Sequence, residues 1–169
     1  MSQSAIADEI TGAFIASLRA LGTSVQTMSE VATKFEDPSL HGLFLALGRA
    51  ERKVFLVPSV GLINVHVRSA STGFWGVQKT VTKDFEALAH HLEIPGYFVF
   101  LVGRGAGDRH VADGYIASDL CSSPFVRPAK AQATNYKINE KQDLDTSKKL
   151  LGTSKIAKVL LQNRWAAKP

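Results

Sequence analysis

The stretch that decides the fold runs from residue 54 to residue 68 and has the sequence VFLVPSVGLINVHVR. Its first four residues are wholly apolar, and Pro58 to Gly61 have the composition of a turn. From residue 62 onward, apolar and polar side chains alternate. We therefore predict a β-hairpin whose strands lie at 54–57 and 62–68.

The second strand of this hairpin has two different faces, because successive side chains of a strand point to opposite sides. Every second residue from 63 to 67 is Ile or Val, whereas Asn64, His66 and Arg68 form a polar row on the other face. If the strand lies inside a sheet, this row must line a cleft or meet partners, since buried polar groups without partners cost free energy. If the strand lies at an edge, the row faces water.

The sequence around the hairpin predicts further helices and strands. Apolar spacings and capping signals favour helices at 4–21, at 28–35, from Asp37-Pro38 to Gly48, at 79–93 and at 155–164. Short apolar runs favour strands at 97–102 and 114–117, and residues 121–135 have no regular pattern. We expect one α/β domain over residues 1–169, with a core at 4–120 and a mixed central sheet of about four strands flanked by helices.

The net charge of +5 is unevenly distributed along the chain. Residues 1–120 hold ten Lys and Arg against twelve Asp and Glu, whereas residues 121–169 hold ten against three. A basic segment of this kind favours a polyanion such as DNA or RNA as partner, because each Lys or Arg over a phosphate releases condensed counterions. A solvated basic tail that aids solubility would have the same composition.

Composition also bears on the compartment. The first four residues carry no basic region of a signal peptide, and no run approaches the roughly 18–20 apolar residues that span a bilayer. Cys121 is the single cysteine and cannot form an internal disulfide. We therefore expect a cytoplasmic protein without a membrane partner, and homo-oligomerisation stays open.

The order of helix, short hairpin, helix and hydrophobic strand resembles the core of the PD-(D/E)XK nuclease superfamily, which includes restriction enzymes and DNA-repair nucleases. The likeness extends over about residues 4–120. The segment from Val65 to Ser69 looks like the family's acid-x-Lys strand, and Ser71 to Gly76 suits its small and aromatic loop at the mouth of the cleft. The resemblance implies a restriction-endonuclease-like fold.

Carried over residue by residue, the resemblance places unusual residues in the catalytic positions. His66 stands where the second metal-binding carboxylate is expected, and Arg68 stands where the catalytic Lys is expected. Mg²⁺ prefers oxygen ligands, and Arg68 stays protonated and cannot act as a base. An active metal-dependent phosphodiester hydrolase would need Mg²⁺ and a carboxylate from Glu51, just before the first strand, or from Glu9 on the first helix.

A non-catalytic domain that binds nucleic acid needs neither a metal ion nor these carboxylates, and we favour this interpretation. In this reading the polar row contacts phosphate oxygens. Six further residues would add positive charge: Lys79, Lys83, Arg104, Arg109, Lys155 and Lys158. Two alternatives remain, an active endonuclease and a non-catalytic protein-interaction or regulatory domain. No metal site is predicted, and DNA is not distinguished from RNA.

Overall fold

The predicted hairpin forms the centre of the computed structural model, which describes residues 3–105 and 111–163. Strand β2 (Val54–Val57) pairs antiparallel with β3 (Gly61–Arg68), with Val54 opposite Asn64 and Val57 opposite Gly61. The turn requires glycine at position 61, where φ is 144° and a Cβ atom would lie 2.2 Å from the carbonyl oxygen of Pro95. The hairpin prediction is confirmed.

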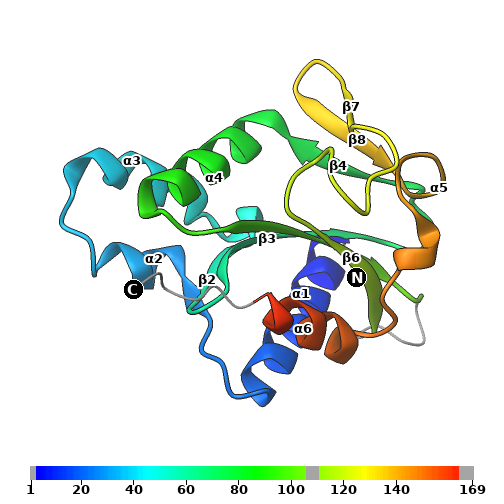
Figure 1. Ribbon diagram of the computed structural model, residues 1–169, viewed down its shortest axis with the longest axis horizontal. Coiled ribbons are helices and arrows are strands. Elements are labelled where there is room, and N and C mark those ends of the chain that lie inside the picture. Colours follow the sequence, from blue (N-terminus) through cyan, green and yellow to red (C-terminus); the bar gives the residue numbers. More distant parts are fainter. Residues whose placement is uncertain (1–2, 106–110, 164–169) are drawn as a thin grey trace.

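The hairpin belongs to a five-stranded mixed sheet with the order β1-β2-β3-β5-β6 (Figure 1). Strand β5 (Gly96–Gly103) runs parallel to β3, and β6 (Ala112–Ala117) runs antiparallel to β5. The fifth strand, β1 (Gln26–Thr27), is two residues long and was not predicted, because so short a strand leaves no pattern in the sequence. The expected mixed sheet flanked by helices is confirmed.

Strand β3 is an interior strand, so the edge-strand alternative is wrong. It pairs with β5 from Leu62 opposite Gly96 to Arg68 opposite Val102. On its other side, the pairing with β2 reaches only as far as Asn64, which lies opposite Val54, the first residue of β2. One more hydrogen bond follows, from the N–H of Val65 to the carbonyl oxygen of Lys53 at 3.0 Å. The polar row therefore begins in the middle of the sheet and ends where β3 has left its hairpin partner.

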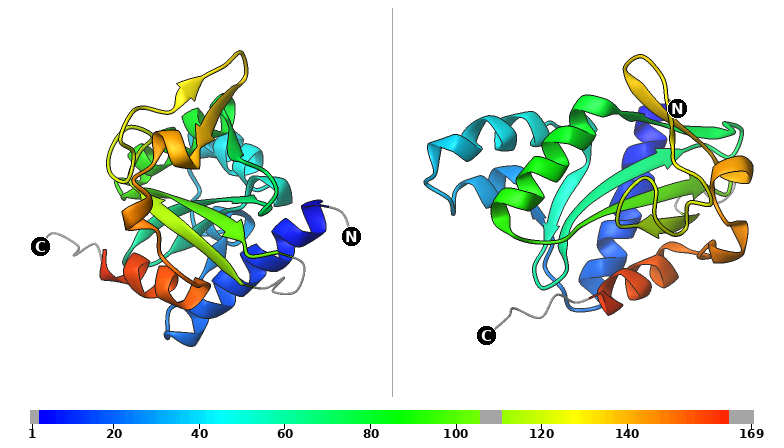
Figure 2. Two further views of the ribbon diagram at one scale, coloured as in Figure 1. Left: turned by 90° about the vertical axis from the view of Figure 1, so that its right-hand side faces the viewer. Right: turned by 45° about the horizontal axis from the view of Figure 1, so that its top comes forward.

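Helices cover both faces of the five-stranded sheet (Figures 1 and 2). Helices α1 (Gln3–Ala20) and α6 (Thr153–Gln162) pack on the face that carries Ile63 and Val65. The opposite face is covered by α2 (Met28–Ala32), α3 (Pro38–Leu47) and α4 (Lys79–Leu92). Helix α4 lies in the crossover between the parallel strands β3 and β5. None of the helices in the described residues has the length and apolarity that crossing a bilayer takes.

The helix predictions agree with the structure to within a few residues. The side chain of Asp37 caps α3 by accepting a hydrogen bond from the backbone N–H of Ser39 at 2.9 Å, and Gly48 is the C-cap. Helix α2 ends at Ala32, three residues before its predicted end. Helix α6 begins at Thr153, two residues before its predicted start, and its N-cap is Gly152.

A second, smaller sheet packs against the α4 side of the main sheet and was not predicted. It has the order β4-β8-β7, formed by β4 (Phe74–Gln78), β8 (Asn135–Asn139) and β7 (Lys130–Ala131). The sequence had predicted no strand at 74–78, and residues 121–135 had been expected to be irregular. The described residues also contain three short elements, η1 (Ala50–Arg52), α5 (Glu140–Asp143) and η3 (Thr146–Lys148).

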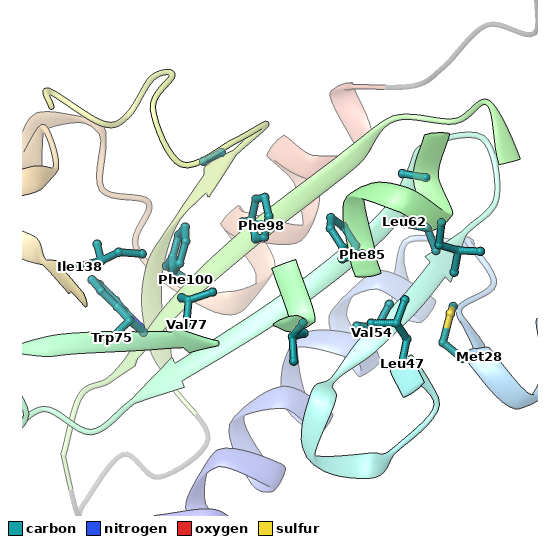
Figure 3. Packing of buried hydrophobic residues seen from close by; sticks show 14 of the residues in the cluster. Met28, Leu47, Val54, Leu62, Trp75, Val77, Phe85, Phe98, Phe100 and Ile138 are labelled. Atoms are coloured by element: carbon teal, nitrogen blue, oxygen red, sulfur yellow. The ribbon is translucent and has the colours of Figure 1, made fainter. Parts of the chain in front are cut away.

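Burial explains why the small sheet forms. Trp75, Val77 and Ile138 project from it into the main core, where they are at most 2% exposed. Figure 3 shows these three side chains beside Phe100 and near Phe98 of β5. The indole N–H of Trp75 also donates to the carbonyl of Leu101 at 2.9 Å. The small sheet thus has one apolar face against the core and leaves its other face outward.

Candidate functional site at the end of β3 and on the small sheet

The polar row of β3 begins with a residue that solvent does not reach. Asn64 is 0% exposed, and no side chain or backbone group in the described residues offers a hydrogen bond to its amide oxygen or nitrogen. Such a group costs free energy in the folded state. A ligand outside the protein cannot reach Asn64 in this structure.

His66 is half-buried and lies among aromatic rings. Its ring stacks against Phe98 and Phe100, with centroid distances of 6.2 and 5.5 Å. Its Nε2 atom is buried without a hydrogen-bond partner from the described residues. Burial lowers the pKa of His66 to about 4, so the imidazole is neutral at pH 7. A neutral imidazole among apolar rings is a poor contact for a phosphate.

Arg68 ends the row and is held by an internal network. Its Nη2 donates to Oε1 of Glu140 at 2.5 Å, and its Nη1 donates to the carbonyl oxygens of Ser69 and Thr72. The guanidinium carbon also lies 4.5 Å from the ring centroid of Trp75. Only 8% of the Arg68 side chain is exposed. Its hydrogen bonds are therefore directed to the protein.

Glu140, at the start of α5, is the centre of this network. Besides Arg68, it accepts a hydrogen bond from the hydroxyl of Tyr115 at 2.6 Å and pairs with Nζ of Lys149 at 3.0 Å. Burial alone would raise the pKa of Glu140. The hydrogen bonds from Tyr115 and Lys149 and the two nearby cations outweigh burial and hold that pKa below its ordinary value. Burial and the bond to Glu140 raise the pKa of Tyr115. The carboxylate is thus ionised and fully engaged at pH 7.

The residues around the end of β3 do not fit Mg²⁺. This ion takes oxygen ligands, including one or two carboxylates, whereas the carboxylate at this place already accepts from three donors and lies between two cations. The position where the resemblance led us to expect the second metal ligand holds the imidazole of His66. Among residues 3–105 and 111–163, no three His, Cys, Asp or Glu side chains gather where they could hold a metal ion.

The structure does not bring the two candidate carboxylates to His66. Glu9 lies on α1, whose apolar residues pack against Val65, and the side chains of Val65 and His66 point to opposite faces of the sheet. Glu51 is exposed on η1. Lys53, directly before the first strand of the hairpin, pairs through its Nζ with Asp8 at 2.7 Å.

The lysines and arginines that were predicted to contact nucleic acid lie in separate parts of the molecule. Lys79 and Lys83 line a cavity of about 520 Å³ beside Tyr136, on the α4 side of the sheet. Lys155 and Lys158 are exposed on α6, which packs on the other face. Arg104 donates two hydrogen bonds to Oδ1 of Asp113, at 3.0 and 2.7 Å. The prediction for Arg109 lies outside the described residues.

The outward face of the small sheet has a different composition. Phe74 is 40% exposed on β4, and Nζ of Lys137 lies 4.4 Å from its ring centroid. Lys137 of β8 stands directly opposite Lys130 of β7 in the antiparallel register. Within the described ranges, no acidic side chain forms a salt bridge with either lysine. We call Phe74, Lys130 and Lys137 the small-sheet face.

A cavity of about 310 Å³ adjoins this face, between the N-terminal part of α1, the end of β3 and the start of β4. Its lining includes apolar side chains, two hydroxyl groups and the base of the Arg68 network: Ile6, Val67, Arg68, Ser69, Thr72 and Phe74. The hydroxyl groups of Ser69 and Thr72 lie 2.9 Å apart. Phe74 belongs both to this cavity and to the small-sheet face.

Sequence reasoning missed the pairing that creates the small-sheet face. The segment from Asn135 to Asn139 alternates between polar and apolar residues, which is the pattern of a half-buried strand and could have revealed β8. Glu140 had no such signal. It lies 72 residues from Arg68 in the chain, and only the fold brings the two side chains together.

Comparisons with known proteins give a distant structural likeness. No protein-family model matches the sequence, and no curated protein matches it. A solved structure of Hjc, a Holliday junction resolvase from the archaeal hyperthermophile Archaeoglobus fulgidus, is similar over 85% of this chain and 96% of that chain. The sequence identity is 10% and the TM-score is 0.40. At this distance the likeness assigns no role to any residue of this chain.

Proposed function

We propose that this chain binds nucleic acid through the small-sheet face and that the end of β3 serves as structural support without metal-dependent cleavage. The observation that carries the proposal is the pair Lys130 and Lys137, which stand directly opposite each other without an acidic partner in the described residues. Like charges in this arrangement destabilise a sheet. A polyanion placed over them removes the repulsion and releases its counterions.

The chemistry of the neighbouring residues supports this partner. Phe74 offers an exposed aromatic ring beside the two lysines, and aromatic rings next to cations are the usual elements of surfaces that bind nucleic acid. Gln78 and Asn135, also exposed on β4 and β8, add amide groups that can bond to phosphate or base edges.

The role of β3 follows from its contacts. Arg68 gives its hydrogen bonds to Glu140 and to backbone carbonyls, and this joins β3 to α5 directly after β8. The strand that resembles a nuclease strand therefore supports the small sheet in this proposal. Cleavage would require carboxylates that are free to bind a metal ion, whereas Glu140, the carboxylate at this place, is engaged by Arg68, Tyr115 and Lys149.

The test is binding to a random duplex and a random single strand over a series of salt concentrations. Each lysine that neutralises a phosphate adds about 0.9 to the slope of log K against log salt for duplex DNA and about 0.7 for a single strand. The double variant Lys130→Gln/Lys137→Gln should therefore lower the slope by about 1.8 on duplex and about 1.4 on single strand.

The matched control is Lys155→Gln/Lys158→Gln, which removes two exposed lysines from the opposite side of the molecule. The proposal requires that this control lower the slope by less than the small-sheet variant. An affinity that ignores salt, or equal slopes in the small-sheet variant and the wild type, would contradict the proposal.

A further inference from the structure

We infer that the ligand is single-stranded and that one unstacked base enters the 310 Å³ cavity beside Phe74, with its phosphates directed towards Lys137 and Lys130. This inference rests on the proposed function and names the class of nucleic acid and the place of its base. Three properties of the cavity carry it: its size, its lining and its position.

The size suits one small planar group. Ligand pockets in proteins have volumes of about 300–1,000 Å³, and this cavity lies at the lower end of that range. The outward face of a three-stranded sheet, with a two-residue edge strand, is small. A base still paired and stacked in a duplex cannot enter such a cavity, because it would first have to leave the helix at a cost of a few kcal/mol.

The lining matches the chemistry of a base better than that of a phosphate. Phe74 supplies an aromatic ring, and Ile6 and Val67 supply aliphatic surface. The hydroxyl groups of Ser69 and Thr72 can donate to or accept from the edge of a base. Arg68 also borders the cavity, but Glu140 neutralises its charge at 2.5 Å. The cavity is therefore apolar and hydrogen-bonding rather than cationic.

The position of the cavity links this site to the two lysines. Phe74 lines the cavity and also lies under Nζ of Lys137, and Lys137 faces Lys130 across the sheet. A single strand of nucleic acid with one base against Phe74 would place the flanking phosphates next to Lys137 and Lys130. The arrangement of one aromatic platform beside a basic track is how proteins bind single strands with little sequence preference.

The experiment measures the affinity of four proteins for three probes at one salt concentration. The proteins are wild type, Phe74→Ala, Phe74→Tyr and Phe35→Ala. The probes are a twelve-nucleotide single strand, the matching duplex, and a single strand of the same length that lacks its bases. Phe35 is the matched control because it is 43% exposed, close to the 40% of Phe74, and lines a different cavity, between α2 and α3.

Stacking of one base on an aromatic side chain corresponds to a loss of about 5-fold or more in affinity when the ring is removed. Phe74→Ala should therefore weaken binding of the single strand by this factor and leave the duplex and the base-free strand unchanged. Phe74→Tyr should restore the affinity, because tyrosine keeps the ring, and Phe35→Ala should have no effect. The affinity of wild type for the base-free strand should be as low as the affinity of Phe74→Ala for the twelve-nucleotide single strand.

Each other outcome overturns the inference. Equal losses on single strand and duplex, or no loss in Phe74→Ala, would show that no base stacks there. If the two lysines still set the salt slope in that case, the proposed function stands and only the base cavity is rejected. If wild type binds no nucleic acid at any concentration in the salt series that tests the proposed function, that function fails first and the inference fails with it.

Discussion

The network around Glu140 gives the sharpest test of how β3 is used. If Arg68 is a structural residue, breaking its pair with Glu140 should destabilise the fold and leave nucleic-acid binding intact. If Arg68 contacts phosphate, the opposite should hold. The two variants to compare are Arg68→Leu and Glu140→Gln, together with the double variant.

The magnitude follows from the burial of the two partners. The side chains of Arg68 and Glu140 are 8% and 12% exposed, so they fall near the class of buried pairs, in which loss of one partner costs about 3–5 kcal/mol. Glu140→Gln keeps the shape of the side chain but leaves two cations without a counter-charge, so we expect a loss of about 3 kcal/mol.

Arg68→Leu should cost less, about 1–2 kcal/mol, because Lys149 still balances Glu140 and the leucine side chain can still pack on Trp75. The coupling free energy between the two positions should reach about 1.5 kcal/mol or more. The assay is urea unfolding followed by tryptophan fluorescence, with the coupling taken from the double-mutant cycle.

The pair Lys53 and Asp8 is a matched control within the same chain. Its atoms are 2.7 Å apart, but the Asp8 side chain is 71% exposed, so its coupling should stay below about 1 kcal/mol. A coupling between Arg68 and Glu140 no larger than that of the control pair would refute the reasoning. So would a salt slope that falls by about 0.9 on duplex DNA in Arg68→Leu, since this is the effect of a lost phosphate contact.

Three further predictions follow from single features of the structure. Burial lowers the pKa of His66 to about 4, so the folded state does not take up a proton at pH 5, whereas the unfolded chain takes one up near pH 6.5. The free energy of unfolding should therefore fall by about 2 kcal/mol between pH 7 and pH 5. In urea unfolding at both pH values, His66→Gln should lose less stability between pH 7 and pH 5 than the wild type does. A loss equal to that of the wild type would mean that groups other than His66 cause it. Gly61→Ala should cost about 2 kcal/mol or more in the same assay, because φ is 144° and the new Cβ would meet the carbonyl oxygen of Pro95; a cost below about 0.5 kcal/mol would disprove the strain. Plasmid incubated with Mg²⁺ or Mn²⁺ should stay intact, and nicking that disappears in Glu51→Ala would establish a metal site that the described contacts of β3 do not predict.

Local patterns were enough to predict four of the five strands of the main sheet, all but the two-residue β1. The hairpin at 54–68 is marked by a turn between an apolar run and an alternating run, and the continuous apolar run at 97–102 is typical of a strand buried on both faces, so both signals lie within a few residues. The capping residue Asp37 and the stop at Gly48 are likewise local, and they fixed α3 at both ends. The sequence therefore predicts best those elements that depend on interactions between residues close together in the chain.

The candidate site was predicted less well because it depends on distant pairings. The polar row on β3 was correctly placed on one face, but the sequence could not show that aromatic rings of β5 would lie against His66. Nor could it show that Glu140 would neutralise Arg68 across 72 residues. A charged residue on a strand has the same local pattern whether its partner is a phosphate or a carboxylate supplied by the fold.

The small sheet has a consequence for how the protein opens. It lies outside the five-stranded sheet, its edge strand β7 has two residues, and it unites segments from distant parts of the chain. Such a unit can separate locally while β3 and β5 stay paired, so its amide hydrogens should exchange with solvent earlier than those of the central strands. Nucleic acid bound across Phe74, Lys137 and Lys130 would span all three strands and hold them closed. Ligand concentration would then set the lifetime of this part of the fold, because a ligand that binds only the closed form adds RT ln(1 + [L]/Kd) to its stability.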